Sequence, residues 1–396
     1  MKRTQDWVVN GYSERWLRKG FPWVYAKEIV RGRRIAGGQV RVLSERGDVL
    51  ARGIMDDGPL AARIYRTDDG PLDAPWFSSV LDRAVSLRET LTGDQTTGYR
   101  LIHGENDGLP GLRVDVWGHY LMVVLESAAV RPLFEMALPV LMERCAPRGV
   151  YLCMRKGHSM EGYSGAAELV AGHPPPGLVR VFERGLAMDV DMAAGPDVGL
   201  YTDMRDLRAW LEPFWGGSRV LNTFSFTGAF SVAAALGGAS EIVSVDCSAP
   251  IIARSEHNFR ANGLDPAGHD FLVQDVSKAL DRFRRTGRRF DRVVIDPPSF
   301  SRSDGEIFSM KKGYPRLVAA ACRVLDDGGW LVLASNHGGT SPHQFQGYCA
   351  EGMRKAGCFG QLLYAGTQSA DCPAATTFPE GQYLKTRVYR VLKEQA

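Results

Sequence analysis

The sequence lacks any long hydrophobic run. No stretch of its 396 residues approaches the ~18 consecutive apolar residues of a membrane-spanning helix, and the first residues hold no apolar signal-peptide core. With 44% hydrophobic and 23% charged residues, the composition also excludes a disordered or collagen-like chain. We therefore expect a globular, cytoplasmic protein without a membrane partner, built from about two to four domains.

Cysteine is also sparse. The seven cysteines are odd in number and widely spaced, and no two of them form a CxxC pair. This pattern predicts neither a disulfide framework nor a zinc site, and no other metal site is indicated. We interpret the thiols as reduced and mostly buried.

An excess of one charge is absent too, because 48 Lys and Arg face 45 Asp and Glu, for a net charge of +3. The distribution is uneven: residues 1–34 hold nine basic residues against three acidic ones, and a second basic cluster runs from Lys278 to Arg292. Each cluster could be a solvated helix face, but two of them indicate a polyanionic partner such as nucleic acid. Trp23 and Tyr25, in the first cluster, serve either as packing or as surfaces on which bases stack.

The pattern of apolar residues changes twice along the chain. Residues 1–75 are β-rich and predict a small β domain. Residues 76–177 mix amphipathic helices with short strands and predict a central α+β domain. Residues 178–396 alternate strands with helices, which is typical of a doubly wound α/β sheet. The turn-forming stretches TDDGPLDAP and GHPPPG mark the two boundaries.

Ligands of doubly wound sheets bind beyond the carboxyl ends of the strands. Three predicted strands of residues 178–396 end near an acid, namely Asp246, Asp275 or Asp296. The first strand instead leads into NTFSFTGAF, which holds a single glycine, Gly228. A dinucleotide-binding loop needs several glycines so that its backbone can approach a pyrophosphate. The single glycine therefore favours a nucleoside cofactor without phosphates, such as S-adenosylmethionine, with Asp246 placed to accept hydrogen bonds from the ribose.

The segment DPPSF follows the apolar residues VVI of a predicted strand. The carboxylate of Asp296 and the carbonyls around Pro297 and Pro298 offer rigid acceptors, and Phe300 offers an apolar face for a planar ring. This arrangement can hold a base amino or imino group while a methyl group arrives in line from sulfur. We therefore predict that Asp296, Pro297 and Pro298 belong to a catalytic site.

Taken in order, these motifs resemble those of the bacterial large-subunit rRNA methyltransferases that carry an N-terminal PUA domain. The resemblance covers nearly the whole chain. PWVYAKEI resembles the start of the PUA domain, and RLIHGENDGLPGLRVDVWG resembles the family's central RNA-binding domain. Five further segments resemble successive motifs of the family's catalytic domain: GLYTDMRD, NTFSFTGAF, SVDCS, DPPSF and FPEGQYLKTRVYRV. The resemblance implies S-adenosylmethionine as cofactor and a base of 23S rRNA as substrate, either naked or in a large-subunit precursor; a homodimer stays open.

By position, the resemblance assigns Asp246 to the ribose, Asp275 to the adenine side and the loop 222–228 to the methionine side of the cofactor. Within GLYTDMRD, Asp203 and Arg205 are expected near the cofactor, with a structural ion pair as the alternative for Arg205. The full expected cofactor-binding set is Asp203, Arg205, Asn222, Phe224, Thr227, Gly228, Asp246, Cys247, Asp275, Val276 and Asp296.

The chain departs from this family at one informative position. Cytosine-C5 members have Ser-Cys-Ser after the fifth strand, and that Cys is their nucleophile, whereas this chain has ASNHGG with Asn336 in its place. Asn336 and the upstream PDVGLYTDMR are more similar to the rRNA guanine-N7 branch, which normally lacks this PUA arrangement. Carbon 5 of a pyrimidine needs prior addition of a thiolate, whereas a ring nitrogen does not. We therefore predict methylation of a purine nitrogen, guanine N7 first and an exocyclic amine second, with Asn336 orienting the base.

Three alternatives stay open. Cys372, in SADCPAATTFPEG, could supply the nucleophile of a cytosine-C5 enzyme. A catalytically inactive relative could act as an RNA-binding or ribosome assembly factor. A small-molecule methyltransferase would leave residues 1–175 hard to explain.

Overall fold

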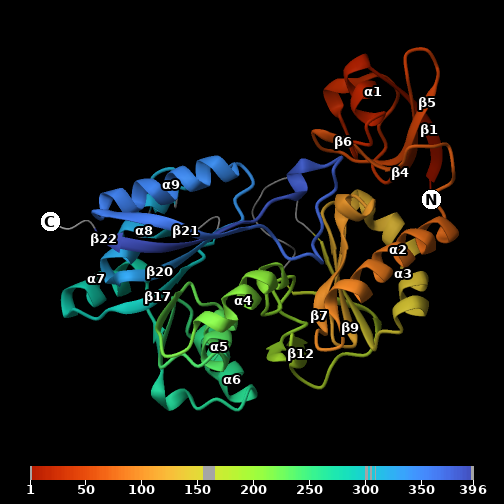
Figure 1. Ribbon diagram of the computed structural model, residues 1–396. Coiled ribbons are helices and arrows are strands. Elements are labelled where there is room, and N and C mark those ends of the chain that lie inside the picture. Colours follow the sequence, from red (N-terminus) through yellow and green to blue (C-terminus); the bar gives the residue numbers. More distant parts are fainter. Residues whose placement is uncertain (1, 155–165, 299–301, 304–305, 308, 394–396) are drawn as a thin grey trace. The chain divides into compact units, whose positions relative to one another are not determined.

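The structure is a computed structural model that describes residues 2–154, 166–298, 302–303, 306–307 and 309–393 (Figure 1). Ser299 and Phe300 of the DPPSF motif lie outside the described residues. Among the helices described, none has the length and apolar character needed to cross a bilayer. The chain forms two compact units. Unit 1 comprises Met1–Gly185, Val190–Val198 and Ala370–Gly381, and unit 2 comprises Leu186–Asp189, Gly199–Ser369 and Gln382–Ala396.

Unit 1 begins with a six-stranded sheet in the order β2-β6-β5-β4-β1-β3. The segment GQVRVL of β4 buries every second residue, as a strand with one core-facing side does. Trp7, Val40 and Val42 lie in the core of this sheet. The expected β-rich domain is confirmed. Its elements are β1 (Lys2–Val9), α1 (Gly11–Leu17), β2 (Trp23–Tyr25), β3 (Ile29–Arg31), β4 (Gly38–Leu43), β5 (Val49–Met55) and β6 (Leu60–Arg66).

The second sheet of unit 1 has five strands in the order β11-β10-β9-β8-β7. Two amphipathic helices cover it, because Phe77 and Leu81 of α2 share one core with Leu133 and Phe134 of α3 and with strand residues such as Val123. The expected central α+β arrangement is therefore present. Its elements are α2 (Ala74–Thr92), β7 (Gly98–His103), β8 (Leu112–Trp117), β9 (Tyr120–Leu125), α3 (Arg131–Cys145), β10 (Gly149–Met154) and β11 (Glu168–Gly172).

A late segment of the chain, Ala370–Gly381, belongs to unit 1. Arg88 of α2 is fully buried and donates to both carboxylate oxygens of Asp107 at 2.7 Å and to the carbonyl oxygen of Asp371 at 2.9 Å. The same segment carries Cys372, whose exposure is 1%. The buried arginine thus ties residues that are almost 300 positions apart in sequence.

Unit 2 contains a seven-stranded sheet in the order β16-β15-β14-β17-β20-β22-β21. The first five strands are parallel, whereas β22 is antiparallel to β20 and β21 is antiparallel to β22. The expected doubly wound α/β fold is confirmed. The strands are β14 (Arg219–Thr223), β15 (Glu241–Asp246), β16 (Asp270–Val273), β17 (Phe290–Ile295), β20 (Leu325–Ser335), β21 (Cys358–Gly366) and β22 (Lys385–Lys393). The shorter strands of the remaining chain are β12 (Val179–Glu183), β13 (Leu186–Val190), β18 (Arg302–Ser303) and β19 (Glu306–Ile307).

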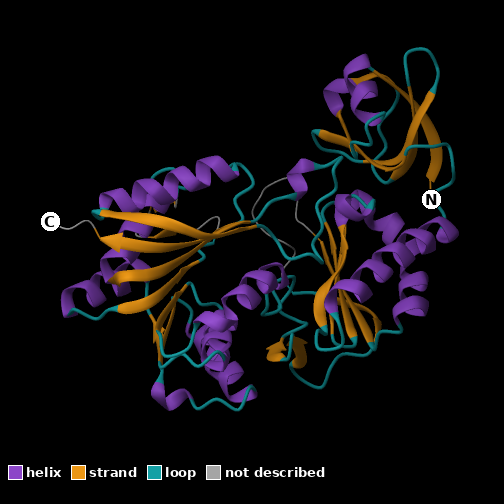
Figure 2. Ribbon diagram, viewed as in Figure 1, coloured by secondary structure: helices purple, strands orange, loops and turns teal. Residues whose placement is uncertain are grey.

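Helices lie on both faces of this sheet (Figure 2). Phe283 of α7, Tyr314 of α8 and Phe345 of α9 share one core with strand residues such as Val293, so these three helices cover one face. Figure 1 places α5 and α6 on the opposite face. The helices are α4 (Arg205–Leu211), α5 (Ala229–Leu236), α6 (Ala249–Ala261), α7 (Val276–Thr286), α8 (Gly313–Val324) and α9 (Pro342–Lys355).

Candidate active site

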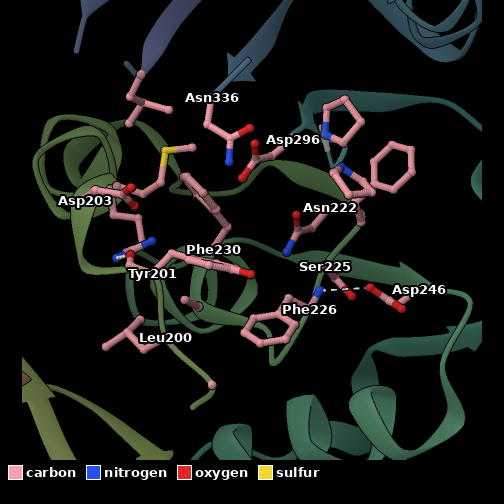
Figure 3. Close-up of a pocket in the computed structure, with 18 residues that line it drawn as sticks. Leu200, Tyr201, Asp203, Asn222, Ser225, Phe226, Phe230, Asp246, Asp296 and Asn336 are labelled. Atoms are coloured by element: carbon pink, nitrogen blue, oxygen red, sulfur yellow. Dashed lines mark hydrogen bonds between the residues drawn. The ribbon is translucent and has the colours of Figure 1, made fainter. Parts of the chain in front are cut away.

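Four parallel strands of unit 2 end at one edge of the sheet. They are β14, β15, β17 and β20, and the segments that follow them surround one pocket (Figure 3). β15 lies on one side of β14 and β17 lies on the other. The pocket therefore occupies the point where the winding of the sheet reverses, which is where doubly wound folds bind their ligands.

The pocket has an empty volume of about 960 Å³, including its mouth, which is open to solvent. In Figure 3, Asn336 and Asp296 lie toward one end of the pocket, and Asp246 and Phe226 lie toward the other. Eight of the residues predicted from the sequence line it: Asp203, Asn222, Phe224, Asp246, Asp296, Pro297, Pro298 and Asn336.

Asp246 is the last residue of β15, and backbone groups hold its carboxylate in place. One oxygen accepts from the N–H of Phe226 at 3.1 Å (Figure 3). The other accepts from the N–H of Ser248 at 3.1 Å. A carboxylate has about four lone-pair directions, so two such bonds leave it able to accept from a ligand. The geometry suits a diol such as the ribose of a nucleoside.

The loop after β14 has an unusual backbone. Phe224 has φ = 52° and Phe226 has φ = 48°, in the left-handed region that residues other than glycine rarely adopt. Such strain occurs at functional sites when surrounding contacts enforce it. One enforcing contact is the bond from the Phe226 N–H to Asp246. The ring centroids of Phe226, in this loop, and Tyr201 lie 5.2 Å apart. The two aromatic rings therefore line the pocket together.

The sequence did not single out ten of the lining residues. Several belong to motifs that were recognised, so the signal was the motif itself: GLYTDMRD contributes residues on either side of Asp203, and the FSF segment contributes residues beside Phe224. The pattern of apolar and polar residues in those motifs does not reveal which of their side chains face the pocket. The ten residues are Gly199, Leu200, Tyr201, Met204, Arg208, Ser225, Phe226, Ala229, Phe230 and Leu384.

Three predicted cofactor residues near this loop are not among the pocket-lining residues. The Thr227 hydroxyl donates to the carbonyl oxygen of Gly199, and Arg205 is buried at the start of α4. Gly228 precedes α5 with φ = 87°, and a Cβ atom there would lie 2.2 Å from the Oγ atom of Ser255. The glycine therefore permits the close approach of α5 and α6.

Asp275, Val276 and Cys247 do not line the pocket either. The Asp275 carboxylate accepts from the N–H of Lys278 at 3.0 Å and so caps the N-terminus of α7. Val276 is buried in the core beneath the sheet, and Cys247 is exposed after β15. A backbone N–H thus holds Asp275, core packing holds Val276, and Cys247 faces solvent.

Asp296 has the most perturbed carboxyl group of the pocket. Burial and, to a smaller extent, the negative charge of Asp203 raise its pKa, the guanidinium of Arg208 opposes them, and the resulting pKa is about 7. The carboxyl therefore changes its protonation state near neutral pH. Perturbed groups of this kind within a cleft are characteristic of functional sites.

The aromatic residues of the first basic cluster form a continuous series in unit 1. Successive ring centroids lie 6.4 Å apart for Tyr12–Trp16, 5.9 Å for Trp16–Phe21, 5.9 Å for Phe21–Trp23 and 6.3 Å for Trp23–Tyr25. The Trp23 indole N–H donates to Glu105 at 2.9 Å, and both Trp23 and Tyr25 are only partly exposed. Packing thus accounts for these two residues, whereas Tyr12 and Trp16 present 55% and 39% of their surface to solvent.

The comparisons with known proteins agree with this architecture. Residues 129–359 match the family of S-adenosylmethionine-dependent methyltransferases, and residues 8–67 match the PUA-like domain. Ribosomal RNA large subunit methyltransferase I of Escherichia coli O139:H28 (strain E24377A / ETEC) is 34% identical over 391 residues, which cover 96% of this chain and 97% of the relative. The protein of the same name from Enterobacter sp. (strain 638) is 34% identical over 397 residues, which cover 97% and 99%.

Two solved structures share the fold. A methyltransferase complexed with SAH has a TM-score of 0.88 at 24% identity, over 97% of this chain and 99% of that chain. A SAM-dependent methyltransferase from Streptococcus mutans has a TM-score of 0.85 at 24% identity over the same shares. From its fold, its pocket and these matches, the chain belongs to the family of S-adenosylmethionine-dependent methyltransferases that includes the ribosomal RNA large subunit methyltransferase I proteins, and S-adenosylmethionine is its cofactor.

Proposed function

We propose that this chain methylates a base of large-subunit ribosomal RNA, and that the acceptor is a purine nitrogen, with guanine N7 first and an exocyclic amine second. The names of its relatives specify large-subunit rRNA but neither the base nor the atom. One observation carries the proposal: Asp296, Pro297 and Asn336 line the same pocket as Asp246, and no thiol lines it among the described residues. An rRNA substrate, either naked 23S rRNA or a subunit precursor, implies action in the cytoplasm.

The residues at the Asp246 end of the pocket fit S-adenosylmethionine. The Asp246 carboxylate, already oriented by two backbone N–H groups, would accept from the ribose hydroxyls. The rings of Tyr201 and Phe226 offer flat apolar surfaces for the adenine. When bound, the cofactor supplies an electrophilic methyl group on a sulfonium sulfur. Asn222 and Phe224 would then lie along its methionine part.

The residues at the other end fit a purine base that has been flipped out of its stack. The carboxylate form of Asp296 would accept a hydrogen bond from an amino or imino group, and the amide of Asn336 would orient the ring. A nitrogen lone pair attacks the methyl group directly, so that the protein needs only to position the base and exclude water. For an exocyclic amine, Asp296 would also receive the released proton.

The cysteines argue against the cytosine-C5 alternative. All seven lie in the described part of the chain, and none lines the pocket. Burial raises the pKa of Cys153 to about 11 and that of Cys349 to about 12, so both stay protonated at neutral pH. A thiol must be deprotonated to act as a nucleophile. Cys372, the substitute considered from the sequence, is buried in unit 1 with an exposure of 1%.

For the RNA contact we propose the exposed face of α1 together with the turn that follows it, residues 18–20. The guanidinium of Arg15 lies 5.7 Å from the ring centre of Tyr12, and the ammonium of Lys19 lies 5.2 Å from that of Trp16. Exposed rings flanked by cations are suited to stacking with unpaired bases while the cations meet phosphates. The PUA-like match, residues 8–67, includes this helix.

The second basic cluster, Lys278 to Arg292, is less suited to binding RNA. Carboxylates of the protein already bind several of its side chains. Arg284 and Arg285 both bind Asp281, at 2.9 and 3.1 Å. Arg288 binds Asp270 at 2.7 Å and also contacts Glu241. Acidic partners thus hold the guanidinium groups of Arg284, Arg285 and Arg288, although α7 itself keeps four basic residues against one acid, Asp281.

An RNA-binding factor without catalysis is the second candidate, and the Asn336 substitution favours it. The pocket weighs against it, because a factor that binds only RNA has no use for an oriented Asp246 carboxylate. Calorimetry with S-adenosylmethionine separates the two functions. Micromolar binding supports the enzyme, and absence of binding supports the factor.

The proposed function is tested by mass spectrometry of 23S rRNA nucleosides from a deletion strain beside its parent. We expect one methylated purine, 7-methylguanosine first, to disappear and to return when the gene is restored. Purified protein with labelled S-adenosylmethionine should add the same group to the deletion-strain rRNA. Recovery of 5-methylcytosine as the product would overturn the choice of atom, and loss of no nucleoside would overturn the choice of rRNA.

A further inference from the structure

Three segments far apart in sequence meet around the base end of the pocket. Asp203 belongs to the short 3-10 helix η4 (Thr202–Met204), Asn336 follows β20, and Leu384 immediately precedes β22. All three residues line the pocket. The relative positions of Asp203 and Asn336 therefore depend on what joins these segments.

Tyr383 joins the β22 segment to η4. Its hydroxyl donates to a carboxylate oxygen of Asp203 at 2.6 Å. The backbone of Asp203 is anchored separately, because its carbonyl oxygen accepts from the N–H and the hydroxyl of Ser369 at 2.8 and 3.0 Å. The tyrosine thus fixes the direction of the Asp203 carboxylate, while Ser369 fixes its main chain.

Lys385 joins the β22 segment to the Asn336 segment. It is paired with Ser335 in the antiparallel β20–β22 ladder, and its ammonium donates to the carbonyl oxygens of His337 and Tyr383, at 2.7 Å each. One side chain therefore connects the residue after Asn336 with the residue that holds Asp203.

Burial of this lysine is costly. Its exposure is 3%, and desolvation lowers its pKa to about 8. Its two hydrogen-bonding partners among the described residues are carbonyl oxygens, which compensate a buried charge less well than a carboxylate does. Costly buried polar groups of this kind are kept where a geometry must be specified.

We propose that Tyr383 and Lys385, called here the β22 brace, are positioning residues that hold Asp203 and Asn336 in the geometry required for methyl transfer. Neither Tyr383 nor Lys385 is among the residues that line the pocket, so the brace acts through Asp203 and the Asn336 segment. This inference rests on the proposed function for its catalytic part. Its structural part, that Lys385 immobilises residues 336–340, stands without it.

Lys385→Met tests the brace because methionine keeps most of the length and removes the donor. Hydrogen exchange of residues 336–340 should accelerate about tenfold, since the His337 carbonyl loses its shorter hydrogen bond and keeps only the one from the Thr340 N–H at 3.1 Å. With rRNA as substrate, kcat should fall at least tenfold, while the dissociation constant for S-adenosylmethionine and the KM for RNA stay within about twofold. A binding stoichiometry of one cofactor per chain shows that the variant is folded.

Tyr383→Phe is the second variant, and it removes a single oxygen atom. We expect kcat to fall severalfold, with exchange of residues 336–340 unchanged because Lys385 is intact. The matched controls lie on the same strand, β22, away from the pocket: Lys393→Met and Tyr389→Phe should match the wild type in both measurements.

Each outcome decides the inference. Unchanged exchange in Lys385→Met overturns the brace, whatever the activity. Faster exchange with unchanged kcat overturns its role in the reaction. If the wild-type protein itself does not methylate rRNA, the proposed function fails, and the exchange result alone still supports or refutes the immobilising role of Lys385.

Discussion

The ends of β15 and β16 look alike in the sequence and differ in the structure. Each carries an aspartate, and both were expected to bind the cofactor. Asp246 accepts from the backbone of Phe226, which belongs to the neighbouring loop, and lines the pocket. Asp275 accepts from Lys278, three residues further on, and caps α7. β15 adjoins β14 at the switch point, whereas β16 is the edge strand. A strand-end acid thus acquires its role from the loop that faces it.

The two basic helices differ in the same way. α7 contains four Lys and Arg, whereas α1 contains only Arg15 and is followed by two more basic residues, one of them Lys19. Arg15 and Lys19 lie beside exposed aromatic rings. On α7, Arg284 and Arg285 share Asp281. Residue type alone therefore does not distinguish a surface with free cations from one whose cations already bind the protein's own carboxylates.

The largest effect is expected at the ends of β17 and β20. Asp296→Ala and Asn336→Ala should each lower kcat about a hundredfold, as loss of one positioned polar group in an active site commonly does. The measurement is transfer of labelled methyl to rRNA at saturating cofactor. Cofactor affinity should be retained in Asn336→Ala. A variant with more than half the wild-type kcat would remove that residue from the base site.

A strong pH dependence is expected from Asp296. Because its pKa is raised to about 7 and the carboxylate is the form that accepts from the base, kcat/KM should fall about tenfold per pH unit below that value. The linkage has the opposite sign for stability: the folded-state pKa exceeds the unfolded one, so this group's contribution to the unfolding free energy increases as pH falls from about 7 toward 4. A flat profile between pH 5.5 and 8, measured with folded protein, would contradict the role of the carboxylate.

Asp246 and Asp275 allow a direct test of the strand-end comparison. Asp246→Ala should weaken S-adenosylmethionine binding at least tenfold, because each hydrogen bond to a carboxylate is worth roughly 1.5–3 kcal/mol. Asp275→Ala should change affinity less than twofold and instead lower the unfolding free energy by about 1 kcal/mol through loss of the N-cap. Calorimetry and thermal unfolding measure the two effects. Equal losses of affinity would show that both acids reach the cofactor.

Trp16 and Arg284 test the comparison of the basic helices. Trp16→Ala should weaken binding of single-stranded RNA fivefold or more, since stacking on an aromatic ring is worth about 1–3 kcal/mol per base. Arg284→Gln, on α7, should leave RNA affinity nearly unchanged because this guanidinium is bound to Asp281. Fluorescence anisotropy at one fixed salt concentration provides both values. Equal weakening by the two substitutions would restore α7 as an RNA contact.

Much of this molecule could be predicted from the sequence, for identifiable reasons. Alternating strands and helices predicted the doubly wound sheet, and the sequence motifs NTFSFTGAF, SVDCS and DPPSF predicted which strand ends carry pocket residues such as Asp246 and Asp296. These features are local in sequence. The position of Asp275 outside the pocket was less accessible, because it depends on β16 being the edge strand of the sheet.

Other parts depend on contacts between distant segments. Phe226 has a positive φ, and its N–H donates to Asp246, twenty residues away. The contacts of Lys385 with His337 and Tyr383 depend on the pairing of β20 with β22. Side-chain periodicity along one segment carries no information about such contacts. The sequence therefore could not identify every residue that lines the pocket, because several distant segments converge there.

The smallest effect is expected at Cys372, the cysteine that the sequence allowed as a substitute nucleophile. Its thiol is buried within unit 1 and does not line the pocket. Cys372→Ala should therefore leave kcat within about twofold of the wild type, with at most a modest loss of stability from the small cavity. An enzyme that adds a thiolate to carbon 6 of cytosine would instead lose all activity with this change and would form a covalent adduct with RNA containing 5-fluorocytosine. Because the two chemistries predict opposite results for one conservative substitution, this nearly silent variant discriminates between them as sharply as the variants with large effects.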